Sequence, residues 1–107
     1  MSLPRVEILY FEDCPNHAAA RALVERIAGE LQVETDIRLI EVGDPDAAVG
    51  LRFLGSPTIR VDGRDVEPGA DQRDDFAFGC RVYRGQRGVS GQPDEAWIRE
   101  ALKAAAA

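Results

Sequence analysis

Residues 6–31 read VEILYFEDCPNHAAARALVERIAGEL and contain the clearest structural pattern of the chain. Its first six letters are mostly aliphatic or aromatic, which is typical of a short buried strand. Further on, apolar side chains recur at helical spacing, at positions 20, 23, 24, 27 and 31. We therefore expect a strand over Val6–Phe11 and a helix over Asn16–Leu31, with Cys14 at the junction and Pro15 in the first helical position.

A second strand and a second helix are expected to follow. Residues 34–42 (ETDIRLIEV) alternate between apolar and polar side chains, as a half-buried strand does. Asp44 can then cap a short helix that Pro45 begins, because Asp favours the cap and Pro the first helical position. Gly55 is expected to end this helix.

A hairpin is expected next. Residues 57–61 (PTIRV) predict a third strand, and the Asp62-Gly63 turn returns the chain into a fourth strand over residues 64–67. The Asp-Gly turn implies an antiparallel pair, whereas connections through helices imply parallel neighbours. The predicted sheet is therefore mixed, with helices on its faces.

The segment after the hairpin is ambiguous. Residues 68–75 are polar and acidic and predict a loop, while residues 76–83 (FAFGCRVY) fit a strand, a packed loop or the start of a helix. Residues 84–92 hold three glycines and also predict a loop. We expect one extended loop over residues 68–92, and then a last helix that opens at Pro93 with acidic side chains in its first turn.

Composition limits the class of protein. The length of 107 residues predicts a single domain over residues 1–107. The net charge of −6 argues against nucleic acid or an anionic membrane as a partner. No secretory leader and no apolar run of the ~20 residues that cross a bilayer is apparent, so we expect a cytoplasmic protein. There, its two cysteines are expected to be free, catalytic or metal-binding.

Three features in order resemble the thioredoxin-like superfamily. They are the strand that runs into Cys14, the sequence GSPTI over residues 55–59 and the sequence VDGRDV over residues 61–66. In that superfamily they correspond to the redox site, the cis-proline loop and the β-hairpin. The resemblance implies an α/β domain with a mixed four-stranded sheet flanked by three helices. A fifth short strand near residues 80–83 is left open.

The resemblance also implies a substrate groove. It predicts a cis peptide bond before Pro57 and a Ser56 backbone that is free to pair with an extended substrate strand. The alternative is a proline that only begins an edge strand. The redox motif Cys-x-x-Cys of the superfamily reads Cys-Pro-Asn-His in this chain, with His17 in place of the second cysteine. The resemblance therefore supports the fold more strongly than a dithiol activity.

Cys14 has the placement of a reactive thiol. A helix N-terminus favours the thiolate, which is the nucleophilic form, and His17 can stabilise the thiolate or accept its proton. Glu12 and Asp13 act in the opposite direction, because their negative charges raise the pKa of a neighbouring thiol. The alternative reading is a cysteine with an exposed histidine at an ordinary helix start.

Cys80 is the second candidate. The link after the hairpin returns to the sheet end that carries Cys14, so Cys80 can serve as its resolving partner. Arg81, Arg84 and Arg87 surround it, and such charges lower a thiol pKa or hold an anionic group such as a glutathione carboxylate. The alternative is a buried cysteine that packs between apolar neighbours.

Three classes of function remain open. The first is a thiol–disulfide oxidoreductase without a cofactor, in which Cys14 attacks, His17 tunes it, Ser56, Pro57 and Arg81 bind a protein or small disulfide, and Cys80 resolves. The second is soft-metal binding or detoxification of zinc, copper or mercury type through Cys14, His17 and Cys80. The third is a thioredoxin-like interaction module without chemistry. Reactivity of Cys14 and bound metal distinguish them.

Overall fold

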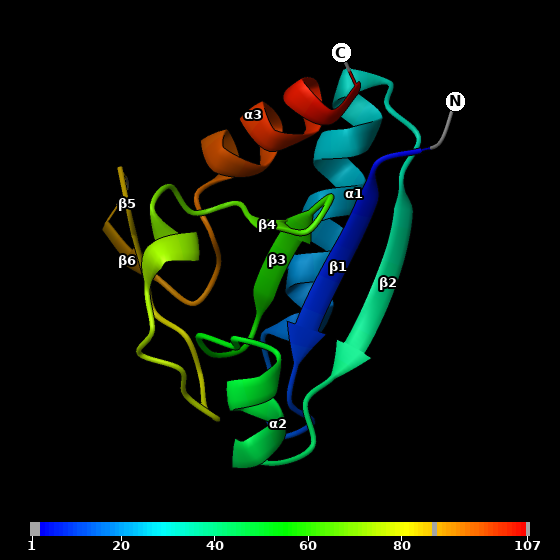
Figure 1. Ribbon diagram of the computed structural model, residues 1–107. Helices are drawn as coiled ribbons and strands as arrows, with labels where there is room; N and C mark the ends of the chain where they lie inside the picture. Colours follow the sequence, from blue (N-terminus) through cyan, green and yellow to red (C-terminus); the bar gives the residue numbers. More distant parts are fainter. Residues whose placement is uncertain (1–2, 87, 107) are drawn as a thin grey trace.

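The computed structural model describes residues 3–86 and 88–106. Along this part of the chain the elements follow one another in the order β1 (Arg5–Tyr10), α1 (His17–Leu31), β2 (Asp36–Glu41), α2 (Pro45–Gly50), β3 (Thr58–Val61), β4 (Arg64–Asp65), the 3-10 turn η1 (Ala70–Gln72), β5 (Tyr83–Gly85), β6 (Gly88–Ser90) and α3 (Glu95–Ala106) (Figure 1).

Four strands form one mixed sheet in the order β2-β1-β3-β4. β1 runs parallel to β2, and it pairs antiparallel with β3, where Ile8 lies opposite Ile59. β3 and β4 are antiparallel across the Asp62-Gly63 turn. Both turn residues have positive φ, of 49° and 86°, which is why Asp-Gly suits this tight connection. The prediction of an α/β chain with a mixed four-stranded sheet and three helices is confirmed.

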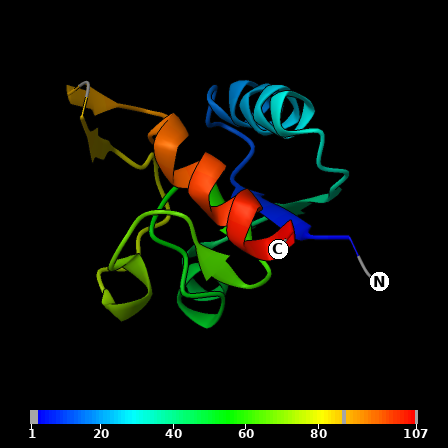
Figure 2. The same ribbon diagram turned by 90° about the horizontal axis from the view of Figure 1, so that it is seen from above.

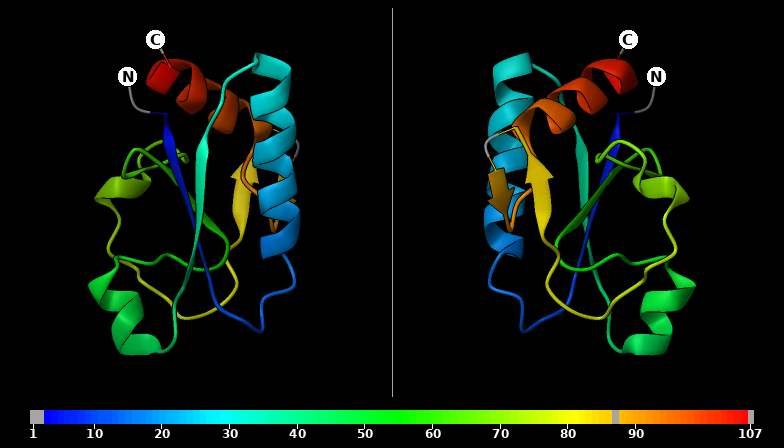
Figure 3. Two further views of the ribbon diagram at one scale, coloured as in Figure 1. Left: turned by 90° about the vertical axis from the view of Figure 1, so that its right-hand side faces the viewer. Right: turned by 90° about the vertical axis from the view of Figure 1, so that its left-hand side faces the viewer.

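The helices lie on both faces of the sheet (Figures 2 and 3). α1 and α3 cover one face, and α2 lies on the other. The larger core fills the space beneath α1 and α3, and Val6 and Ile8 reach into it from β1. Leu9 points to the opposite face, because successive side chains of a strand alternate. It packs there with Val42, Ala48 and Phe53 in a second, smaller cluster.

The start of α2 has the predicted cap. The Asp44 carboxylate accepts a hydrogen bond from the Ala47 N–H at 2.7 Å, and Pro45 occupies the first turn. The cap satisfies a helical N–H group that would otherwise lack a partner. α2 ends at Gly50, earlier than the predicted end at Gly55.

The start of α1 differs from the prediction. The helix begins at His17 with Asn16 as its cap residue, so Pro15 lies in a turn before the helix and not in its first position. Asn16 already has right-handed helical angles (φ −94°, ψ −6°), and no side-chain hydrogen bond caps the helix. Cys14 therefore stands three residues before the helix rather than next to its first turn.

The long link before α3 also differs. Residues 84–92 were expected to form a loop, but β5 and β6 form a small antiparallel hairpin beside the start of α3 (Figure 2). Both strands are only three residues long, and β6 is exposed throughout, so no alternation of buried side chains marks it in the sequence. The suggested fifth strand near residues 80–83 does not join the sheet. Cys80 instead forms an isolated bridge with Ser56.

Candidate active site at Cys14 and Cys80

Cys14 lies in the turn between β1 and α1, and its side chain is buried. Its N–H donates to the Phe11 carbonyl oxygen at 3.0 Å, which closes the turn. Only 1% of the residue is exposed. The thiol donates to the Ser56 carbonyl oxygen at 3.6 Å, so the sulfur points away from solvent and toward the loop before β3.

The loop before β3 is buried and densely bonded. Ser56 and Pro57 are buried, and the peptide bond between them is cis. The Thr58 hydroxyl donates to the Gly55 carbonyl oxygen at 2.6 Å, and the Tyr83 hydroxyl donates to the Pro57 carbonyl oxygen. The Ser56 hydroxyl has no hydrogen-bond partner within the described part of the chain.

Residues 77–81 run alongside this loop and are hydrogen-bonded to it. The Ala77 N–H donates to the Phe53 carbonyl oxygen at 2.9 Å. The Ser56 N–H then donates to Gly79 O at 2.7 Å, and the Arg81 N–H donates to Ser56 O at 2.8 Å. Cys80 is therefore paired with Ser56 in a parallel bridge. The backbone of Ser56 was expected to be free for a substrate strand, and that expectation is wrong because the chain itself fills both bonding positions.

The two thiols influence each other. Cys80 is solvent-exposed, which excludes the reading of a cysteine buried between apolar neighbours. Partial desolvation of its sulfur is the largest cause that raises the pKa of Cys80, and the charge of Cys14 and a side-chain interaction with Cys14 raise the pKa further. Both cysteines thus meet the Ser56 backbone, Cys14 with a buried thiol and Cys80 as an exposed residue.

His17 contacts the backbone of Cys14 and not its sulfur. The ring nitrogen Nδ1 lies 2.8 Å from the Cys14 carbonyl oxygen. A carbonyl oxygen only accepts, so Nδ1 carries the proton and donates. The ring also stacks on Tyr10, with centroids 4.4 Å apart. The described contacts therefore assign His17 to holding the turn, in place of the predicted action on the thiol.

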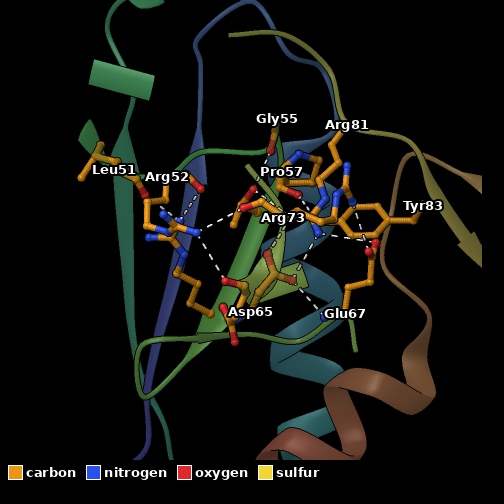
Figure 4. A network of polar contacts seen from close by, with 12 residues as sticks. Leu51, Arg52, Gly55, Pro57, Asp65, Glu67, Arg73, Arg81 and Tyr83 are labelled. Carbon is orange, nitrogen blue, oxygen red and sulfur yellow. Dashed lines mark hydrogen bonds and ion pairs between the residues drawn. The ribbon is translucent and has the colours of Figure 1, made fainter. Parts of the chain in front are cut away.

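Arg81 is not available to a substrate, contrary to the sequence prediction. Its side chain is 2% exposed, and its guanidinium donates to both Asp65 carboxylate oxygens at 2.8 and 3.2 Å (Figure 4). It also donates to the Thr58 hydroxyl at 3.1 Å and lies 3.4 Å from the Glu67 carboxylate. Two carboxylates neutralise the charge, and the Tyr83 ring packs against it with its centroid 4.4 Å away.

This buried ion pair anchors the segment that carries Cys80. Arg81 follows Cys80 directly, so the contacts of its side chain with Asp65 and Thr58 also hold the backbone beside Ser56. The approach is close at Gly55, where an added Cβ would lie 2.9 Å from the Arg81 Cβ. Gly55 also has a φ of +119°, which side chains disfavour. Only glycine fits this contact.

Of the basic cluster predicted around Cys80, Arg81 does not face the exposed thiol. Arg81 points inward, and Arg84 lies in the β5–β6 hairpin. Arg87 lies outside the described residues. The groups that flank Cys80 are apolar instead. Phe78 is 39% exposed and packs on Phe11 with ring centroids 5.2 Å apart, and Val82 is 57% exposed. Sequence reasoning did not identify Phe11 and Phe78 as a pair at this site.

The predicted metal ligands are not gathered. Across residues 3–86 and 88–106, no three His, Cys, Asp or Glu side chains are grouped as a metal site requires. Cys14 and Cys80 are neighbours, but the described contacts of His17 lead to a carbonyl oxygen and a tyrosine ring. The three-ligand site expected from Cys14, His17 and Cys80 is therefore absent from this part of the structure.

Comparison with family models, with curated proteins and with solved structures gave no match. None of the helices in the described residues combines the length and apolar character that a bilayer crossing requires. An assignment of function therefore rests on the geometry around Cys14 and Cys80.

Proposed function

We propose that this chain is a thioredoxin-like thiol–disulfide exchange protein in which Cys14 and Cys80 form the redox pair. The strand order β2-β1-β3-β4, with β1 parallel to β2 and antiparallel to β3, supports the thioredoxin-like assignment. The position of Cys14 between β1 and α1, facing the loop before β3, supports the location of the redox site. A reducing compartment such as the cytoplasm would keep the dithiol as the resting form.

One observation carries the proposal. The Ser56 carbonyl oxygen accepts a hydrogen bond from the Cys14 thiol. The same oxygen accepts a hydrogen bond from the backbone N–H of Arg81, the residue directly after Cys80. A disulfide requires two Cα atoms about 5.5 Å apart, so the proposal depends on the segments of both cysteines meeting at this one carbonyl group. Cys80 thus supplies the second thiol of the pair, which the motif lacks because it has His17 in that position.

Atoms and electrons balance in this exchange without a cofactor. The two thiols give two electrons to a disulfide substrate, which becomes two thiols, and a Cys14–Cys80 disulfide forms. The thiol protons end on the released product. The reverse reaction oxidises a dithiol substrate. The direction is set by the reduction potentials of the two couples.

Intact-mass spectrometry of the protein treated with hydroxyethyl disulfide tests this proposal. We expect the wild-type protein to lose two hydrogens and both alkylatable thiols while it stays monomeric, and peptide mapping to locate a Cys14–Cys80 bond. Cys14→Ser and Cys80→Ser should each abolish that bond. A wild-type protein that keeps two free thiols, or forms only intermolecular disulfides, would contradict a redox pair and favour an interaction module.

A further inference from the structure

We propose that Cys80 is the thiol that attacks and that its substrate is a small, non-peptidic disulfide, with Cys14 as the buried resolving thiol. This assignment rests on the proposed function. It reverses the roles that the sequence motif predicts, because there the cysteine at the helix start attacks.

The backbone edge beside Cys14 is not open to an extended peptide. A peptide that binds as an added strand requires free N–H and C=O groups along an edge. Ser56 donates its N–H to Gly79, and its carbonyl oxygen accepts from Arg81. The Phe53 carbonyl oxygen is also bonded, to Ala77. An extended peptide therefore finds the edge next to Cys14 already filled by the chain.

The two cysteines differ in their exposure to solvent. Exchange requires that a thiolate reach the substrate disulfide from outside. Cys14 is 1% exposed, and its thiol faces a carbonyl oxygen in the interior. Cys80 is exposed, and the glycine before it has open space where a Cβ would be. A reagent from solvent therefore meets Cys80 before Cys14.

Cys80 lies in an anchored segment with apolar neighbours. The segment is fixed by the buried Arg81–Asp65 pair, which holds it beside Ser56. Phe78 and Val82 expose apolar surface on either side along the chain. The charge of Arg81 is taken up inside the protein, so it does not select for anionic groups. This environment suits a compact disulfide that needs no backbone pairing.

The steps balance as follows. The Cys80 thiolate attacks one sulfur of the disulfide RSSR, an S–S bond between Cys80 and R forms, and RS⁻ leaves. The Cys14 thiolate then attacks the Cys80 sulfur, the internal disulfide forms, and the second RS⁻ leaves. Two electrons pass from the dithiol to RSSR, and the two thiol protons complete two molecules of RSH. In this second step Cys14 needs to reach only the Cys80 sulfur, so its burial does not prevent the attack.

Trapping the mixed disulfide tests the order of attack. With hydroxyethyl disulfide in excess, Cys14→Ser is expected to accumulate a stable adduct on Cys80, since no resolving thiol remains. Native Cys80→Ser is expected to form no adduct, because its remaining thiol is buried. In denaturant the same variant should form the adduct at Cys14, which shows that the Cys14 thiol is intact. Cys14→Ala serves as a second variant should the buried serine weaken the fold.

The result that would overturn the order is an adduct on Cys14 in native Cys80→Ser at a rate equal to that of Cys80 in Cys14→Ser. An internal disulfide in the wild-type protein would then leave the proposed function standing while the role of Cys80 falls. No internal disulfide in the wild-type protein would remove both.

The substrate class has its own measurement. The rates of reduction of hydroxyethyl disulfide and of an extended peptide carrying a mixed disulfide are compared, each divided by its rate with dithiothreitol. We expect the normalised rate of the peptide to be no higher than that of the small disulfide. A clearly higher normalised rate for the peptide would mean that the segment of residues 77–81 moves aside, and it would contradict the assignment.

Discussion

Cys80 lies opposite Ser56 in a parallel bridge, and the Ser56 carbonyl oxygen also accepts the thiol of Cys14. A single backbone group thus joins the segments of two cysteines that are far apart in the sequence. Anything that shifts residues 77–81 away from Ser56 should separate the two sulfurs. The predictions below use this relationship.

Arg81→Leu should both destabilise the protein and slow formation of the internal disulfide. Removal of the guanidinium leaves the Asp65 carboxylate, which is 4% exposed, without its counter-charge. Loss of one partner of a buried pair typically costs about 3–5 kcal/mol of unfolding free energy. Urea unfolding measures the loss, and the rate of thiol disappearance with hydroxyethyl disulfide measures the effect on the site.

Arg21→Ala is the matched control for Arg81. Arg21 pairs with Glu25 one turn away on α1, and both side chains are about half exposed. Such a pair contributes about 0.3–0.5 kcal/mol, so stability and disulfide formation should stay close to wild type. Equal losses in the two variants would show that the buried pair does not anchor the segment that carries Cys80.

Gly55→Ala and Gly29→Ala should have opposite effects. At Gly55 a Cβ meets the Arg81 Cβ at 2.9 Å and its Cα at 3.0 Å, with φ at +119°, so alanine should push residues 80–81 outward and destabilise the protein. Gly29 lies in α1 with nothing within 4 Å of an added Cβ, so alanine should stabilise by about 0.5–1 kcal/mol. Thermal unfolding compares them, and a neutral Gly55→Ala would disprove the close contact.

Cys14→Ser should lower the pKa of Cys80. Desolvation is the largest cause that raises this pKa, and the charge and contact of Cys14 add to it. Replacing Cys14 removes the effect of its charge and contact but leaves the desolvation of Cys80. The labelling midpoint of Cys80 should therefore fall but stay above the usual pKa of a free cysteine. Iodoacetamide labelling of Cys80 against pH measures both midpoints. Identical midpoints would mean that the two thiols do not interact.

Tyr83 should make the fold less stable in alkali. Burial is the largest cause that raises the pKa of Tyr83, although the charge of Arg81 partly opposes it. The phenol stays neutral in the folded state while the unfolded chain ionises above about pH 10, so stability falls as the pH rises past that value. One proton gives a slope of at most about 1.4 kcal/mol per pH unit.

Tyr83→Phe isolates this effect. The variant should lose about 1 kcal/mol at neutral pH, because the Pro57 carbonyl oxygen loses its donor, and its stability should fall less steeply above about pH 10. Denaturant unfolding of both proteins across this range measures the two slopes. Parallel curves would show that the Tyr83 phenol does not contribute to the alkaline loss.

Helices and turns that depend on residues close together in the chain could be predicted from the sequence. The apolar spacing over residues 20–31 predicts α1, Asp44 and Pro45 predict the start of α2, and Asp62-Gly63 predicts the β3–β4 turn. Helical spacing, caps and tight turns depend on residues no more than a few positions apart. These elements and their connections were enough to predict a mixed α/β sheet.

Only the tertiary structure decided the site. The pairing of Cys80 with Ser56, the burial of Arg81 against Asp65 and the contact of His17 with a carbonyl oxygen do not follow from spacing. They depend on the conformation of the link between β4 and β5, and a link of this length can adopt many conformations. The buried ion pair and the backbone bonds to Ser56 select one of them, which places an accessible thiol over a buried one.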